Sequence, residues 1–185
     1  KTRQLDTFRV GGDLKNSKSP YFLEGCRFGI AKRFLELVEE EEGEFLWLTQ
    51  SSPFDYGFNH GLRAAQAQYG APVLSKYLPK DIYSAHLSNL CKNKLVIAEI
   101  PEESSQQSFL FFLWMLEAAA ESNYQTILIH LDEGLVGEDK KAIEQACESL
   151  EKLRMEGKKI YFGCDRFIAG SPQEKLASAL GGVLQ

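Results

Sequence analysis

Ser171 is the residue whose setting most favours covalent chemistry. It follows a predicted strand at 159–163 and directly precedes Pro172, which opens a predicted helix over 172–180. The first turn of a helix attracts negative charge, and a lysine of lowered pKa can activate a serine hydroxyl placed there. A serine before a proline is also an ordinary helix cap, so the residues alone allow either a nucleophile or a cap.

Asp132, Glu133 and Gly134 form a second candidate site. They follow the apolar run 126–131, a predicted buried strand, and so come where α/β sheets hold ligands. The two carboxylates could bind Mg²⁺ or take up protons. They equally suit a solvated turn that leads into a helix with an acidic start. His130 alternates inside the strand, which favours a buried histidine.

A complete phosphate-binding or metal-binding signature is absent. A strand, loop and helix pattern spans 49–61, but it lacks the glycine-rich code with its lysine and hydroxyl residue, and His60 is expected on the helix surface. The four cysteines have no paired spacing and no histidine partner, so we expect buried free thiols and predict no metal and no cofactor. These cysteines are Cys26, Cys91, Cys147 and Cys164.

The composition is that of an acidic folded domain. The 185 residues include 21 Lys and Arg against 26 Asp and Glu, a formal charge of −5, and 44% are hydrophobic. This balance disfavours nucleic-acid binding, since phosphate-binding surfaces are usually basic. No apolar run is long enough to span a bilayer and no signal peptide is visible, so membrane association would need segments absent from this chain. The start at Lys1 is compatible with a fragment, and no residue pattern indicates a compartment.

Strand-like runs alternate with helical periodicity along the chain. Because strands separated by helices imply parallel neighbours, the predicted fold class is α/β with a mainly parallel sheet and crossover helices. Residues 109–120 are apolar on all sides and predict a central helix. We divide the chain into an N-terminal α/β segment, 1–93, and a core, 94–185, which could also form one continuous domain. Strands are predicted at 7–10, 44–49, 72–77, 94–100, 126–131 and 159–163, and helices at 21–40, 57–69, 81–92, 104–120, 139–156 and 172–180.

Residues 94–185 resemble the crotonase/Clp-protease fold, and within it the signal peptide peptidase A (protease IV) family. The likeness follows the order of the runs KLVIAEI, EAAAESN, TILIHLDEG and AGSPQEKLASA. The N-terminal run FRVG, followed by Lys15 and Lys18, is similar to the stretch around the catalytic lysine of that family.

The resemblance implies a serine-type endopeptidase. Ser171 would attack the peptide carbonyl and Lys15 or Lys18 would act as the base, while the turn at 132–134 would line the substrate groove. It also implies a peptide or protein substrate and a homo-oligomer.

The oxyanion-binding turns of that family are altered in this chain. Where that family has a Ser-Pro-Gly-Gly turn, this chain has Asp-Glu-Gly-Leu at 132–135. Where the family has glycines after the serine, this chain has Pro-Gln-Glu at 172–174. Proline has no N–H to donate, and losing one oxyanion donor costs about 3–4 kcal/mol of barrier. Activity is therefore open, and a non-catalytic oligomeric scaffold or peptide-binding module of the same fold is an alternative.

A degenerate RecA-like P-loop domain is the other alternative. The runs GEFLWLTQSS, LVIAEI and ILIHLDE are similar in layout to secretion and pilus-retraction ATPases. Without the phosphate-binding code this layout predicts weak or no ATP binding. It also predicts that the strand at 44–49 lies beside the strand at 126–131, whereas a crotonase-like fold predicts stacked turns of two strands and a helix.

Overall fold

A computed structural model describes residues 2–4, 27–50, 56–75, 80–90, 93–100, 105–131, 140–163, 166–168 and 175–176. Strands β2 to β6 form a five-stranded parallel sheet in the order β3-β4-β2-β5-β6, and β1 and β7 form a separate antiparallel pair. The predicted α/β class with a parallel sheet is confirmed. The elements are β1 (Thr2–Gln4), α1 (Arg27–Glu40), β2 (Phe45–Thr49), α2 (Tyr56–Tyr69), β3 (Val73–Leu74), α3 (Lys80–Leu90), β4 (Leu95–Glu99), α4 (Ser105–Ala120), β5 (Thr126–His130), α5 (Lys140–Met155), β6 (Lys159–Gly163) and β7 (Arg166–Ile168).

The predicted positions of the sheet strands and of the helices agree closely with their positions in the structure. Gly43, Gly70 and Gly157, which follow α1, α2 and α5, have φ values of 95°, 58° and 86°, the left-handed conformation that ends helices. The predicted strand at 7–10 lies outside the described residues, as does the helix at 172–180 apart from 175–176. The three-residue strands β1 and β7 were not predicted, because neither shows a run long enough to alternate.

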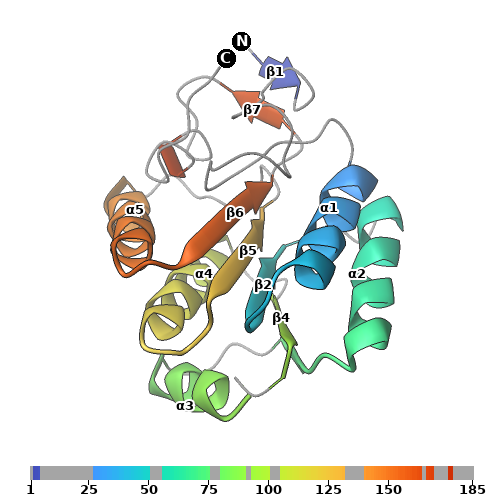
Figure 1. Ribbon diagram of the computed structural model, residues 1–185. Helices are drawn as coiled ribbons and strands as arrows, with labels where there is room; N and C mark the ends of the chain where they lie inside the picture. The colour runs from blue at the N-terminus through green and yellow to red at the C-terminus, as the bar shows by residue number, and fades with distance from the viewer. Residues whose placement is uncertain are drawn as a thin grey trace.

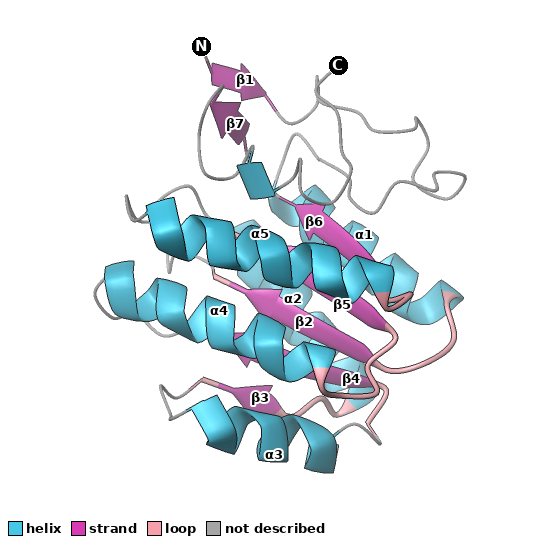
Figure 2. Cartoon of the chain, turned by 90° about the vertical axis from the view of Figure 1, so that its left-hand side faces the viewer, coloured by secondary structure: helices cyan, strands magenta, loops and turns pink. Residues whose placement is uncertain are grey.

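The path of the chain decides which helices cover which face of the sheet. The chain leaves the central strand β2 for the edge strand β3, then returns through β4 and β5 to β6. Because crossovers of one hand change face when the direction reverses, α2 must cover one face and α3, α4 and α5 the other. Figures 1 and 2 show this arrangement, with α1 beside α2.

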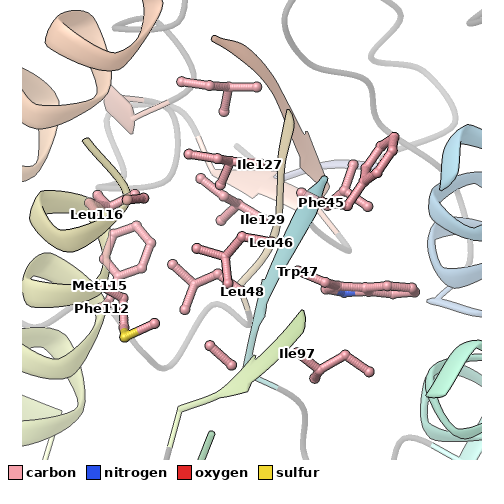
Figure 3. Packing of buried hydrophobic residues seen from close by; sticks show 14 of the residues in the cluster. Phe45, Leu46, Trp47, Leu48, Ile97, Phe112, Met115, Leu116, Ile127 and Ile129 are labelled. Atoms are coloured by element: carbon pink, nitrogen blue, oxygen red, sulfur yellow. The ribbon is translucent and has the colours of Figure 1, made fainter. Parts of the chain in front are cut away.

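The two faces of β2 contact different helices. All of β2 is buried, and Leu46 and Leu48 point toward α4, whereas Phe45 and Trp47 point toward α1 and α2 (Figure 3). Helix α4 packs against α3, α5 and the sheet, and half of its 16 residues are apolar and buried. The prediction of a central helix over 109–120 is confirmed.

Glu41, directly after α1, ties that helix to the amino edge of the sheet. Its Oε1 accepts a hydrogen bond of 3.1 Å from the Tyr161 hydroxyl of β6 and lies 3.7 Å from the Lys159 Nζ. Its backbone carbonyl accepts a 2.6 Å hydrogen bond from the Nζ of Lys94, just before β4. These contacts link the end of α1 to β6 and to the residue before β4.

The tie through Tyr161 predicts a pH dependence of stability. Burial, and then the nearby Glu41 carboxylate, raise the pKa of Tyr161 well above its ordinary value. The folded state therefore keeps this proton above about pH 10, where the unfolded state loses it. The stabilisation is complete below pH 10 and is lost at about 1.4 kcal/mol per pH unit as the pH rises further.

Tyr161→Phe should therefore cost about 1 kcal/mol at neutral pH, through the lost hydrogen bond, and should flatten the decline above pH 10. Urea unfolding of both proteins from neutral pH to about pH 11 measures this. Since all other tyrosines are shared, parallel pH profiles for the two proteins would contradict the prediction.

Candidate functional site at the carboxyl edge of the sheet

A row of three polar residues crosses the carboxyl ends of the central strands. Thr49 ends β2, Glu99 ends β4 and His130 ends β5, and the register pairs Thr49 with both of the others. Paired residues share a face, and Thr49 is two residues after Trp47, so this polar row faces α2. The chain leaves β2 on one face of the sheet and leaves β4 and β5 on the other, which is the topological switch point where α/β proteins bind ligands.

Helix α2 covers the inner part of the polar row with an aromatic ring. Thr49 and His130 are each 1% exposed, and their Oγ1 and Nδ1 atoms share a hydrogen bond of 3.3 Å whose donor depends on the histidine tautomer. The Phe58 ring stacks on the imidazole, with centroids 3.9 Å apart and planes at 20°. Phe58 also meets Trp47 edge-on at 6.1 Å. The Thr49–His130 pair is therefore sealed beneath α2.

The outer part of the polar row is closed by an ion pair. The Arg63 guanidinium of α2 contacts the Glu99 carboxylate and also donates a 2.8 Å hydrogen bond to Gln66 Oε1. The two charged side chains are 53% and 27% exposed, so the pair lies at the surface and contributes at most about 1 kcal/mol to stability. The main effect of the ion pair is electrostatic, because the Arg63 guanidinium already balances the negative charge of the Glu99 carboxylate at the end of β4.

Backbone hydrogen bonds between the strands continue just beyond the polar row. Gln50 N–H donates to the His130 carbonyl at 2.9 Å, and Ile100 N–H donates to the Thr49 carbonyl at 2.8 Å. These hydrogen bonds extend the backbone pairing of the sheet by one residue beyond the polar row. A hydroxyl and an imidazole in contact could serve as nucleophile and base, but each of these two side chains is only 1% exposed.

The residues predicted for a peptidase site lie outside the described residues. This holds for Ser171, for both candidate bases, Lys15 and Lys18, and for the turn of Asp132, Glu133 and Gly134, so those roles remain predictions. Two histidine predictions are confirmed: His130 is buried within its strand, and His60 is exposed on α2.

Cys147 is the one cysteine among the described residues, and it is a free, half-buried thiol on α5. Burial, and then the neighbouring Glu151 carboxylate, raise its pKa, so it is protonated at neutral pH and a poor nucleophile. Within the described residues, no group of three or more His, Cys, Asp or Glu is placed to hold a metal. None of the helices described there has the length and apolar character needed to cross a membrane.

Sequence reasoning missed the polar row, although a signal for it exists. The strands FLWLT, LVIAE and TILIH each end in a polar residue after an apolar run. The sequence predicts Thr49 at the start of the strand, loop and helix pattern over 49–61 and Glu99 inside a strand, but nothing in the linear order says that β2 and β4 are neighbours. The contact between Arg63 and Glu99 could not be predicted for the same reason.

Comparison of the sequence with models of known protein families, and with curated proteins, finds no match.

Proposed function

We propose that this chain is a doubly wound α/β domain of P-loop-like layout that does not hydrolyse nucleotides and serves as a protein-assembly module. The observation that carries the proposal is the place of β2, which lies at the centre of the sheet, parallel to and between β4 and β5. The RecA-like alternative predicted β5 as a neighbour of β2, and β4 as its other neighbour was not predicted. In the described sheet each strand from β2 to β5 is followed by a helix, as that layout requires.

The covered polar row supports a silent site. In P-loop enzymes a loop after the central strand wraps phosphates, and an acidic residue at the end of another strand holds Mg²⁺. Here residues 50–55 read QSSPFD without the phosphate-binding code, and the Glu99 carboxylate is paired with Arg63. A guanidinium in contact with that carboxylate opposes binding of a divalent cation there. A scaffolding role does not require phosphate or Mg²⁺ binding at this edge of the sheet.

Nucleotide binding tests the proposal directly. We expect no rise in melting temperature with ATP or GTP and Mg²⁺, whereas a ligand at one hundred times its Kd would stabilise by about 2.7 kcal/mol. Binding that depends on Mg²⁺ and disappears in Glu99→Gln would show that the carboxyl edge is a working nucleotide site and would overturn the proposal. Glu42→Gln, an exposed carboxylate that follows α1, is the matched control.

Serine-directed labelling tests the peptidase prediction against the same proposal. A fluorophosphonate probe should leave the folded chain unlabelled if the domain is a scaffold. Labelling that is lost in Ser171→Ala and kept in Ser149→Ala would establish an activated serine and favour the peptidase instead. Ser149, half-buried on α5, controls for nonspecific reaction with serines.

A further inference from the structure

The outer face formed by α4 and α5 contains a hollow of about 360 Å³ with an acidic lining. Three glutamates and one lysine contribute charges to it, so it has a net negative charge. We call it the α4–α5 hollow, and it is lined by Glu117, Ala120, Glu121, Gln145, Glu148, Ser149 and Lys152. Its chemistry suits an ammonium or guanidinium group from another molecule.

The same face carries a cation and an aromatic side chain outside the hollow. Lys141 is exposed and lies seven residues before Glu148, which places both on one stripe of α5. On α4 the half-buried residues Leu110 and Trp114 continue the stripe of Glu117 toward the start of the helix. The face is therefore acidic toward the amino edge of the sheet and basic and apolar toward the carboxyl edge.

The spacing makes this face complementary to itself. Helices α4 and α5 both follow parallel strands and pack side by side, so they run in the same direction (Figure 2). Seven residues of helix put Lys141 roughly 10 Å from Glu148 along α5. Glu144 and Gln145 of α5 lie midway between these two charges. A two-fold axis at this level would place Lys141 of each copy over the hollow of the other.

We propose that a second copy of this chain docks on the α4–α5 face in a two-fold, antiparallel arrangement. Lys141 of each copy enters the acidic hollow of its partner, and the two Trp114 rings pack near the axis, as an isologous interface requires. The inference rests on the proposed function, because it names the partner of the assembly module. The attraction between the charges sets the register, and the two Trp114 side chains exclude water near the axis.

Charge reversal tests the pairing in the full chain by sedimentation velocity. Lys141→Glu and Glu148→Lys should each weaken the dimer about tenfold or more, and the double variant should restore it to within about threefold. These two positions are too far apart to pair within one chain, so restoration has to come from contacts between copies. Glu42→Lys, an exposed site that follows α1 on the other face of the sheet, should leave the dimer unchanged, and circular dichroism should show that all variants are folded.

Trp114 gives a second readout. Trp47 is fully buried, so quenching of fluorescence by iodide reports on Trp114 alone, and it should fall as the dimer forms. A wild type that stays monomeric, a dimer indifferent to both reversals, or a double variant that is not restored would overturn the inference. None of these outcomes changes the nucleotide-binding result, so failure here is distinguishable from failure of the proposed function.

Discussion

Phe58→Ala should lower the free energy of unfolding by about 3–5 kcal/mol. The side chain is fully buried, and its ring contacts the imidazole of His130 on one side and the indole of Trp47 on the other. Truncation removes the apolar area of the ring and leaves a cavity that neighbours on two strands cannot fill without shifting the sheet. For a domain of this size the loss corresponds to a melting temperature lower by roughly 6–20 °C.

Urea unfolding followed by circular dichroism measures the effect of Phe58→Ala. The control is His60→Ala, which lies two residues further along α2 and is exposed, so its effect should stay within about 0.5 kcal/mol. A loss for Phe58→Ala as small as that of the control would mean that the ring is not packed over the polar row. The seal above Thr49 and His130, and the argument for a silent carboxyl edge, would then fail together.

Gly61→Ala should destabilise the chain by about 1–3 kcal/mol, although alanine is the better helix former. Gly61 is buried in α2 where α1 crosses it, and a Cβ there would come 2.6 Å from the Cβ of Ala31. Since both atoms belong to helix-backbone positions that cannot rotate away, the helices would have to separate. Figure 1 shows α1 and α2 side by side along this contact.

A compensating substitution separates the steric effect from helix propensity. Ala31→Gly removes the facing methyl group, so the double variant with Gly61→Ala should be more stable than the sum of the two single changes, by about 1 kcal/mol or more. Ala67→Gly, at an exposed site of α2, measures propensity alone and should cost about 1 kcal/mol. If Gly61→Ala instead stabilises the chain by that amount, the close contact between α1 and α2 is wrong.

The elements of the sheet could be predicted because their signals are local. The run at 94–100 is apolar and β-branched, and β4 lies there, while α5 shows its buried face at Ile143, Ala146, Leu150 and Leu153, the period of a helix. Gly70 and Gly157 end their helices because glycine adopts positive φ at little cost. Each of these features depends on residues within a few positions of one another.

The candidate site could not be predicted in the same way. The peptidase prediction depended on the linear order of runs in 94–185, and its residues lie outside the described part of the chain. The polar row depends on β2 lying between β4 and β5, strands that begin 50 and 81 residues further along the chain. The sequence of a strand does not specify which strand lies beside it, since any buried parallel strand offers the same backbone hydrogen bonds.

By itself, the amino-acid sequence determined the α/β class, the central position of the helix at 109–120, the helix ends and the burial of His130. These follow from periodicity and backbone sterics, which act along the chain. The tertiary structure alone decided the strand order, the sealing of Thr49 and His130 by Phe58, and the pairing of Arg63 with Glu99. These contacts join residues from different strands and from the helix that covers them, so they form only in the assembled sheet. The face on which each helix lies is set by the handedness of the crossover connections.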